Sequence, residues 1–500
     1  MKLKIYYTSD VHGYLFPTDY SNDSVQPLGL LSASEQYQRD DNTLVIDGGD
    51  MFQGSPFVNY FQKKDGRATG IIETINKIGY DVVTLGNHDF NHGFERLESE
   101  VRDLNPTVTC VNVLDKEGKM LFPEIIKEMP NGLKVGIVGI TTEYINVWEK
   151  PENIASIQIV DPFPEAKAAL ERIKDQVDIA ICLYHGGFEI DIESKELVSK
   201  TKENIGYRLA RDLDFDLLLT GHQHQTIPGQ LLAGTYIVQP TNMARNFYEI
   251  ELETTGDGVS VTSEMLHPTG EFDQEKFADL IAMNGEVNEY LDQKIGSLPQ
   301  NIEKISHLEL ALKGNDWIRM IASVEKEATQ ADIAVVSSFN ALYPMAQELS
   351  IRDVLVNYPY ENILCKVKLT GTQLKEVMEK TATYFVKEAG QVAINPSWIS
   401  PKLEHYNYDF YFGLDYAFDL NQAEGSRVTK MMLHGKEVAA TDEVTIALND
   451  YRASAGGEYT TYNHALESDN MGVDIQQLVI DAISNDTLPE EMIDFKLTII

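Results

Sequence analysis

Seven side chains of the types that bind divalent metals each follow a short apolar run. The runs with their polar ends are KLKIYYTSD, NTLVIDGGD, DVVTLGNHD, DIAICLYHG and FDLLLTGHQH. If these runs are strands of a parallel sheet, their carboxyl ends meet at one edge, where residues distant in sequence converge. We therefore predict a single metal site whose ligands are Asp10, His12, Asp50, Asn87, His185, His222 and His224.

The ligand set predicts hydrolytic chemistry. Seven oxygen and nitrogen ligands exceed the four that one zinc ion takes, and they suit a two-metal centre. A carboxylate has two oxygens, so Asp50 at the end of GGD is the candidate to bridge the cations. A water held between two cations loses a proton readily and attacks phosphorus in line as hydroxide. Mn, Zn, Fe and Co all suit these ligands, and the sequence does not choose among them.

The motifs differ in how strongly they indicate a site. Asp10 and His12 form D-x-H, and His222 and His224 form H-x-H. Alternate residues of an extended chain point to one side, so each pair is expected to reach one cation. A lone D-x-H is more often a solvated turn. GNHD and GHQH are stronger signals, because polar residues at a tight strand end serve no packing purpose, and five such features argue against coincidence.

His88 belongs to GNHD but is not needed as a ligand. We predict that it is catalytic, stabilising the transition state at the phosphoryl group or protonating the leaving oxygen. The alternative is that His88 only orients Asn87 through a hydrogen bond.

Composition limits the possible partners. The 500 residues include 78 acidic and 41 basic side chains, a formal net charge of −37. That charge argues against binding a nucleic-acid polymer, which requires basic surface. A small phosphorylated substrate remains compatible, because bound metals reverse the charge locally. The oligomeric state is not readable from the sequence.

The cysteines and the apolar segments of the chain indicate its redox state and its compartment. The three cysteines, Cys110, Cys182 and Cys365, occupy apolar, strand-like contexts and match no disulfide or zinc pattern, so we predict buried free thiols. No apolar run approaches the length of a membrane span. The chain starts directly at the first motif without a signal-like segment, so we expect a cytoplasmic protein. A secreted chain whose signal peptide has been removed would look the same.

The chain is expected to form two domains. Apolar strands alternate with amphipathic helices over the first 265 residues, which favours an α/β layered fold. Later strands at Phe247–Glu253 and Val259–Leu266, with Val238, suggest an antiparallel set that closes this domain. The second half is α+β in character, with one helix expected over Gly371–Ala389. We predict domains over 1–270 and 297–500, joined by a helix over 271–296.

These motifs together resemble those of the calcineurin-like metallophosphoesterases. The segment NYPYENILCKVKLTGTQLKEVMEKTA resembles the C-terminal domain of the 5′-nucleotidase family, so the resemblance covers essentially the whole chain. It implies an α/β fold in which a four-layer metallophosphoesterase sandwich precedes an α+β 5′-nucleotidase-type C-terminal domain. It also implies an enzyme that hydrolyses phosphoric esters of nucleotides, with two divalent metal ions as cofactors.

Within that family the chain most resembles the 2′,3′-cyclic-nucleotide 2′-phosphodiesterase/3′-nucleotidase branch. Asn91 stands where 5′-nucleotidases usually carry an Asp that pairs with the catalytic His, which adds Asn91 to the catalytic site. NDYRASAGGEY resembles the loop of that branch. The Gly-Gly-Ile-Arg segment typical of 5′-nucleotidases is absent, and SSFN stands in its place. The alternatives are a 5′-nucleotidase or pyrophosphatase, a thiosulfate-releasing hydrolase, and a non-catalytic nucleotide-binding protein, although the complete ligand set disfavours the last.

The resemblance also implies that two aromatic side chains of the C-terminal domain hold the base. Tyr408 and Tyr451 match those positions best, although Tyr406, Phe410 and Tyr411 compete with Tyr408. Stacking on a ring tolerates any base, because every base has a π-face. The alternative is that these tyrosines are core residues. Weaker candidates for polar substrate contacts are Asn340 and Arg452.

Overall fold

The computed structural model describes residues 1–22, 24–199, 201–256, 258–400, 402–489 and 491–500. The chain divides into two compact units, Met1–Val287 and Asn288–Ile500. Helix α8 (Ala278–Leu291) spans the division and is shorter than the helix predicted over 271–296. The predicted domain limits remain a prediction.

The first unit contains two six-stranded sheets of mixed direction. The first has the order β15-β14-β1-β2-β3-β4, in which β1 to β4 run parallel. Its strands are β1 (Lys2–Thr8), β2 (Thr43–Asp47), β3 (Val82–Val83), β4 (Thr107–Val108), β14 (Phe247–Thr255) and β15 (Gly258–Leu266). The second has the order β12-β13-β11-β10-β8-β7. Its strands are β7 (Ile125–Glu128), β8 (Lys134–Thr141), β10 (Ile179–His185), β11 (Leu217–Thr220), β12 (Ile227–Leu232) and β13 (Thr235–Gln239).

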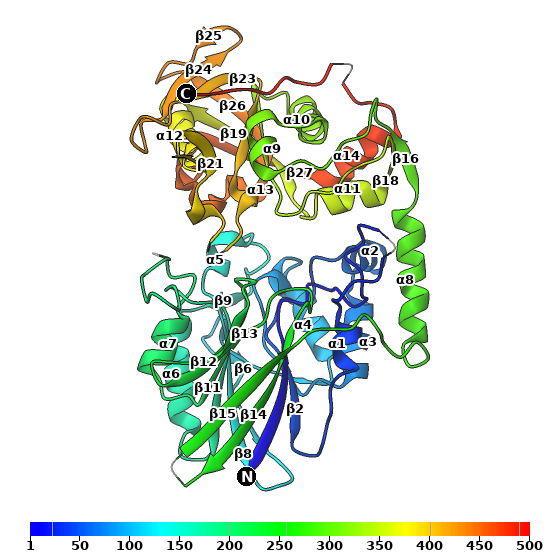
Figure 1. Ribbon diagram of the computed structural model, residues 1–500, viewed down its shortest axis with the longest axis vertical. Helices are drawn as coiled ribbons and strands as arrows, with labels where there is room; N and C mark the ends of the chain where they lie inside the picture. The colour runs from blue at the N-terminus through cyan, green and yellow to red at the C-terminus, as the bar shows by residue number, and fades with distance from the viewer. Residues whose placement is uncertain (23, 200, 257, 401, 490) are drawn as a thin grey trace. The chain divides into compact units, whose positions relative to one another are not determined.

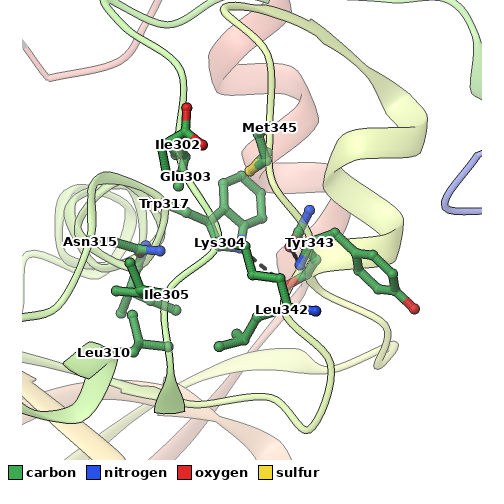
Figure 2. Close-up of a pocket in the computed structure, with 12 residues that line it drawn as sticks. Ile302, Glu303, Lys304, Ile305, Leu310, Asn315, Trp317, Leu342, Tyr343 and Met345 are labelled. Atoms are coloured by element: carbon green, nitrogen blue, oxygen red, sulfur yellow. Dashed lines mark hydrogen bonds between the residues drawn. The ribbon is translucent and has the colours of Figure 1, made fainter. Parts of the chain in front are cut away.

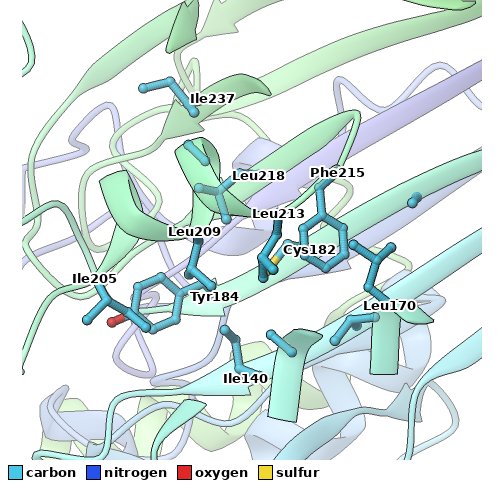
Figure 3. Packing of buried hydrophobic residues seen from close by; sticks show 14 of the residues in the cluster. Ile140, Leu170, Cys182, Tyr184, Ile205, Leu209, Leu213, Phe215, Leu218 and Ile237 are labelled. Atoms are coloured by element: carbon cyan, nitrogen blue, oxygen red, sulfur yellow. The ribbon is translucent and has the colours of Figure 1, made fainter. Parts of the chain in front are cut away.

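The two sheets pack face to face with helices outside them. Apolar side chains of both sheets, such as Ile5, Leu44, Ile181 and Leu219, form one buried cluster. A second cluster joins the other face of the second sheet to helices α6 (Pro162–Ile173) and α7 (Gly206–Asp212) (Figure 3). Helices α1 (Leu30–Ser34), α3 (Thr69–Ile78) and α4 (Phe94–Arg102) lie beside the first sheet, and α6 and α7 beside the second (Figure 1). The predicted four-layer α/β arrangement of this unit is confirmed.

Local sequence explains these elements. All residues of β2 and β10 are buried, as expected for parallel strands covered on both faces. Helix α3 buries isoleucines three or four residues apart and ends at Gly79, which has a left-handed φ of 82°.

The helices are α1 (Leu30–Ser34), α2 (Pro56–Asp65), α3 (Thr69–Ile78), α4 (Phe94–Arg102), α5 (Ile145–Trp148), α6 (Pro162–Ile173) and α7 (Gly206–Asp212). A small sheet joins β5 (Cys110–Asp115), β6 (Met120–Phe122) and β9 (Ile157–Ile159).

The second unit is α+β, as predicted. Its largest sheet has the order β22-β17-β26-β19-β27, and a four-stranded sheet has the order β25-β24-β23-β28. The strands are β16 (Lys294–Ser297), β17 (Ile333–Ser337), β18 (Glu348–Ser350), β19 (Ile363–Thr370), β20 (Phe385–Glu388), β21 (Gln391–Ile394), β22 (Asp409–Phe412), β23 (Leu414–Phe418), β24 (Val428–Leu433), β25 (Lys436–Glu437), β26 (Glu443–Asn449), β27 (Glu467–Asp474) and β28 (Lys496–Ile499). The helices are α9 (His307–Lys313), α10 (Asp316–Thr329), α11 (Ile351–Asn357), α12 (Gly371–Ala382), α13 (Asp450–Ala453) and α14 (Ile475–Ser484).

Two expectations about elements were wrong. The helix predicted over Gly371–Ala389 ends at Ala382, because the following residues form the hairpin β20–β21, whose turn places Ala389 and Gly390 at positive φ. Val238 was expected in the antiparallel set of β14 and β15. It lies in the other sheet, where β13 pairs parallel with β11.

Two predictions about the whole chain can also be compared with the structure. All three cysteines are buried free thiols, as predicted. Among the residues that the structure describes, no helix has both the length and the apolar composition needed to cross a membrane.

Candidate metal centre

The carboxyl ends of strands from both sheets deliver the predicted ligands to one place. Asp10 and His12 follow β1, Asp50 follows β2, and Asn87 follows β3 in the first sheet. In the second sheet His185 ends β10, and the remaining two histidines, His222 and His224, follow β11. The distances given below link all seven side chains into one cluster, most of it buried.

One half of the cluster is formed by Asp10, His12 and His224, whose ligand atoms lie within 4.8 Å of one another. The Nε2 atoms of His12 and His224 are 3.0 Å apart, and Asp10 Oδ1 is 3.5 Å from His224 Nε2. Asp10 also accepts the backbone N–H of His222 at 3.0 Å, which ties the end of β11 to the end of β1. Two imidazole nitrogens and a carboxylate oxygen facing one point form a suitable cation site.

The other half contains Asn87, His185 and His222. Asn87 Oδ1 lies 3.2 Å from His185 Nε2 and 2.8 Å from His222 Nδ1. His185 Nε2 is also 3.2 Å from Asp50 Oδ2. One amide oxygen, two imidazole nitrogens and a carboxylate oxygen therefore converge on a second point.

Asp50 lies between the two halves. Its Oδ2 is 3.9 Å from His12 Nε2 on one side and 3.2 Å from His185 Nε2 on the other. This oxygen is buried, and no donor in the described part of the chain meets it at the angle and distance of a hydrogen bond. The other oxygen accepts the backbone N–H of His88 at 2.7 Å. A buried carboxylate oxygen that faces imidazole nitrogens on both sides is well placed to bind cations together with them, so the residues fit a pair of divalent metal ions.

The electrostatics of the cluster point the same way. Burial alone would lower the pKa of His185, but the Asp50 carboxylate offsets burial and raises this pKa to about 10. Burial alone would raise the pKa of Asp50, yet His185 and His88 bring it well below its ordinary value. The pKa of His12 falls to about 4, chiefly through burial. Burial thus leaves His12 uncharged, and the neighbouring histidines leave Asp50 ionised; a neutral imidazole and an ionised carboxylate are the forms that bind metals.

The backbone of the ligands is not extended as expected. Asp10, His12, Asp50, His222 and His224 all have positive φ, between 49° and 69°. Residues other than glycine rarely adopt this left-handed conformation, and where they do the strain is commonly found at functional sites. The members of D-x-H and H-x-H therefore share a site because each residue turns back toward it, and the predicted reason, alternation along a strand, was wrong.

Two glycines allow the strand ends to approach. A Cβ atom on Gly49, whose φ is 94°, would come within 2.4 Å of the backbone nitrogen of Gly86. A Cβ atom on Gly86 would lie 2.2 Å from Asp50 Oδ1. The glycine of GGD and the glycine of GNHD are therefore needed for the close packing of the two loops.

Polar partners behind the ligands hold them in orientation. Asp89 accepts four backbone N–H groups, from Asp50, Met51, Phe52 and Gly86, at 2.8–3.0 Å. His185 Nδ1 lies 2.7 Å from the carbonyl oxygen of Gly48, and His222 Nε2 lies 2.9 Å from Glu203 Oε1. Such contacts fix which nitrogen faces a metal. Asp89 was overlooked as a functional residue, although GNHD contains it.

His88 and Asn91 are in contact, as their joint assignment to the catalytic site requires. His88 Nδ1 lies 2.8 Å from Asn91 Oδ1, and Asn91 Nδ2 donates to Glu149 Oε2 at 2.7 Å. The His88 and His12 rings meet at 66° with centroids 5.4 Å apart, which places His88 beside the ligand cluster. The catalytic roles of His88 and Asn91 remain predictions.

Two predicted substrate residues are core residues in the structure. Tyr408 is fully buried among Tyr384, Phe385 and Phe410, and its hydroxyl donates to the Ala311 carbonyl at 2.9 Å. Its ring faces are covered by protein, so its assignment to base stacking was wrong.

Arg452 is also fully buried, and its side chain is occupied by protein groups. Its Nε lies 2.8 Å from Asp409 Oδ2, and it donates to the carbonyls of Asn407 and Gly456. The guanidinium therefore serves the fold, and its assignment as a substrate contact was also wrong.

The other two predicted substrate residues are half-buried, and their roles stay predictions. Tyr451 is half-buried, and its ring meets the half-buried Tyr406 ring at 60° with centroids 6.5 Å apart. Tyr360 lies 6.2 Å from Tyr406 and extends this aromatic group. Asn340 Nδ2 donates to the Leu403 carbonyl, while its Oδ1 is buried without a hydrogen bond in the described residues. Sequence reasoning missed Tyr360, although NYPYEN contains it.

A separate pocket in the second unit is too small for a base. It encloses about 10 Å³ and is lined by residues that include Ile302, Lys304, Trp317, Tyr343 and Met345 (Figure 2). That volume holds about one water molecule.

Comparison with known proteins agrees with both units. The calcineurin-like phosphoesterase model matches residues 3–226, and the 5′-nucleotidase C-terminal domain model matches residues 295–464. A crystal structure of a candidate 5′-nucleotidase from Staphylococcus aureus superposes with a TM-score of 0.93 and 31% identity, covering 100% of both chains.

Two curated relatives are similar over most of this chain. A 2′,3′-cyclic-nucleotide 2′-phosphodiesterase/3′-nucleotidase of Haemophilus influenzae is 26% identical over 90% of this chain and 80% of its own length. A trifunctional nucleotide phosphoesterase of Bacillus subtilis is 25% identical over 96% of this chain. The chain spans only 38% of the length of that second relative.

Proposed function

Because the chain belongs to the calcineurin-like metallophosphoesterases that carry a 5′-nucleotidase C-terminal domain, we propose that its substrates are 2′,3′-cyclic nucleotides and 3′-nucleotides. Members of this family are metal-dependent hydrolases of phosphoric esters. The formal net charge of −37 favours a small nucleotide over a nucleic-acid polymer.

The contact between His88 and Asn91 is the observation that carries this proposal. Asn91 occupies the position where the 5′-nucleotidase pattern has an Asp, and it lies 2.8 Å from the histidine that the proposal makes catalytic. SSFN at the end of β17 replaces the segment whose Arg is typical of 5′-nucleotidases. The similarity to the Haemophilus influenzae relative supports the same branch.

The residues divide into two groups of ligands. Asp10, His12 and His224 would hold one divalent cation, and Asn87, His185 and His222 would hold the other. Asp50 faces both groups and would contribute to both sites. When bound, the metals supply an acidic water and neutralise charge on the phosphoryl oxygens. The ions are Mn, Zn, Fe or Co, all of which accept this mixture of nitrogen and oxygen ligands.

The remaining roles fall to side chains outside the ligand set. His88 donates a proton from Nε2 to the leaving oxygen, while its Nδ1 stays hydrogen-bonded to Asn91. Tyr451, together with Tyr406 in place of the buried Tyr408, offers an aromatic face to the base. Asn340, which is half-buried, is the weaker candidate for a polar contact with the substrate.

Parallel assays with three adenosine phosphates test the proposal. The manganese-reconstituted protein is given 2′,3′-cyclic AMP, 3′-AMP or 5′-AMP, and phosphate release and products are measured. We expect the highest kcat/KM with the cyclic and 3′ substrates. Preference for 5′-AMP would refute the branch and favour the second candidate, a 5′-nucleotidase, which the similarity to the Staphylococcus aureus structure supports. Hydrolysis that is undiminished in Asp50→Ala would refute the assignment of the activity to this site.

A further inference from the structure

We propose that Glu149 is a positioning residue for His88, and that it acts through Asn91 to keep the imidazole proton on Nδ1. The inference rests on the proposed catalytic role of His88, but the position of the proton can be measured without reference to activity. Glu149 lies 61 residues beyond His88 and follows α5, so neither motif nor spacing indicated it.

Three side chains form a continuous chain of hydrogen bonds. Glu149 Oε2 accepts from Asn91 Nδ2 at 2.7 Å, and Asn91 Oδ1 lies 2.8 Å from His88 Nδ1. All three side chains are half-buried, so water competes with these bonds less than at an open surface.

The Glu149 carboxylate determines which group donates in each of these hydrogen bonds. An ionised carboxylate can only accept hydrogen bonds, so the amide group of Asn91 must turn its NH₂ toward Glu149. Its oxygen then faces His88. Because an amide oxygen can also only accept, His88 must donate from Nδ1–H. An amide alone has no such preference, since it can rotate and present either its NH₂ or its oxygen to the ring.

Glu149 itself is held on its second oxygen. Oε1 accepts from the backbone N–H of Lys150 at 2.8 Å and from Asn153 Nδ2 at 2.7 Å. Asn153 Nδ2 also donates to the Asn91 carbonyl at 2.8 Å, and the Asn153 carbonyl accepts from Phe94 N–H at 2.8 Å. The segment around Glu149 is thus fastened to the segment that follows His88, and the carboxylate is fixed with respect to Asn91.

The chemical consequence lies at the other nitrogen of the ring. With Nδ1–H bonded to Asn91, neutral His88 has its free lone pair on Nε2, and protonated His88 carries its transferable proton there. In the proposed step the Nε2–H bond breaks, an O–H bond forms on the leaving oxygen, and the Nδ1 proton stays in place. The opposite neutral tautomer would bind its only proton at Nε2 and leave Nδ1 facing Asn91 as an acceptor.

An exchange of the acid and the amide tests this arrangement. In Glu149→Gln both linked side chains are amides, so the preference for Nδ1–H is lost. In the double variant Asn91→Asp with Glu149→Gln, the carboxylate lies next to His88. It can only accept a hydrogen bond, so Nδ1–H is favoured again. Glu152→Gln removes the same charge from an exposed side chain three residues away and is the matched control.

The primary readout is the tautomer of His88. Nitrogen NMR spectra of the zinc-loaded protein with ¹⁵N-labelled histidine are recorded under alkaline conditions, and they distinguish the two neutral tautomers. The His88 signals are identified by their loss in His88→Ala. We expect Nδ1–H in the parent, a mixture with Nε2–H in Glu149→Gln, and Nδ1–H again in the double variant. An unchanged His88 tautomer in Glu149→Gln, with metal content and melting temperature equal to the parent, would overturn the proposal.

Kinetics separate this inference from the proposed function. We expect kcat for 2′,3′-cyclic AMP to fall about tenfold in Glu149→Gln with little change in KM, within the range typical of general acid catalysis. The double variant should regain most of this loss. If the tautomer changes and kcat does not, the role of Glu149 stands and the proposed role of His88 is wrong.

Discussion

Trp148 stacks on the imidazole of His222, with ring centroids 5.4 Å apart and 28° between the ring planes. His222 is thereby held on its face by Trp148 and at Nε2 by Glu203. Trp148 is the last residue of α5, and Glu149 follows it directly. The end of this short helix therefore makes two contacts through adjacent residues. Trp148 contacts the proposed metal ligand His222, and Glu149 contacts Asn91, which is hydrogen-bonded to His88.

Replacing Trp148 by Ala should weaken metal binding without removing a ligand. The His222 ring would lose its stacking partner and sample other orientations, and groups that orient a ligand typically change metal affinity 10- to 100-fold. We expect a loss of about tenfold, measured by competition with a chelator. Trp148→Phe keeps an aromatic face and should bind metal almost as the parent does. Equal affinity in Trp148→Ala and the parent would show that the stacking does not orient His222.

Asp89→Asn should lower stability more than an ordinary change from acid to amide. Asp89 accepts four backbone N–H groups with its two oxygens, and an amide has only one accepting oxygen. Buried N–H groups left without an acceptor cost about 1–3 kcal/mol each. We expect the free energy of unfolding of the first unit to fall by about 2–3 kcal/mol in urea titrations. Asp212→Asn removes an acid in an ion pair with its neighbour Arg211 and should change it little. Similar values for both variants would contradict this account.

Asp50→Asn should reduce the number of metals bound as well as the rate. A neutral amide offers one oxygen and no charge, so it cannot bridge two cations as a carboxylate does. We expect fewer than two metals per chain by elemental analysis. Because metal activation contributes several kcal/mol, we also expect a loss of kcat of about 10²- to 10⁴-fold. Asp415→Asn, in a surface ion pair with Lys430, is the control. Two metals per chain in Asp50→Asn would exclude bridging by Asp50.

The ligands could be predicted from the sequence because each stands at or just after the end of a strand. The strands belong to two sheets, so the expectation of one shared parallel sheet was wrong. The left-handed backbone of the ligands could not be predicted, because only the assembled site compensates the strain at residues such as Asp10 and His224. Glu149 follows a four-residue helix with no periodic pattern, and only the folded chain brings it to Asn91.

The tyrosines show a different limit of the sequence. Tyr406 and Tyr408 are two residues apart and would share a face of a regular strand. A 3₁₀ turn over His405–Asn407 precedes β22, which begins at Asp409, so that Tyr406 meets Tyr451 while Tyr408 enters the core. An aromatic-rich segment does not by itself show where its strand begins.

A buried acid should make the stability of the second unit depend on pH. Glu325 on α10 is 1% exposed, and burial raises its pKa well above the ordinary value. The folded chain keeps this proton at a pH where the unfolded chain, with a pKa of about 4.3, has released it. This contribution to the free energy of unfolding therefore falls as pH rises above that value, by about 1.4 kcal/mol per pH unit.

The isosteric variant Glu325→Gln replaces the titrating carboxyl group with an amide. It should therefore make the free energy of unfolding depend less on pH. We expect the variant to be more stable than the parent at neutral pH, with the difference growing from about pH 5 to about pH 7 in denaturant titrations. Glu327→Gln changes an exposed acid on the same helix and should follow the parent. Parallel stability curves for Glu325→Gln and the parent would show that Glu325 is ionised in the folded protein.

Tyr451→Ala should weaken the binding of substrates that contain a base and leave other phosphoesters unaffected. Stacking contributes about 1–3 kcal/mol per base, so KM for 3′-AMP should rise roughly tenfold to a hundredfold. KM for glycerol 2-phosphate, which has no base, should stay the same. Tyr408→Phe loses the buried hydrogen bond to Ala311, worth about 1 kcal/mol of stability, and should keep the parent KM for both substrates. An equal rise in KM for both substrates in Tyr451→Ala would mean that Tyr451 supports the loop and does not stack on the base.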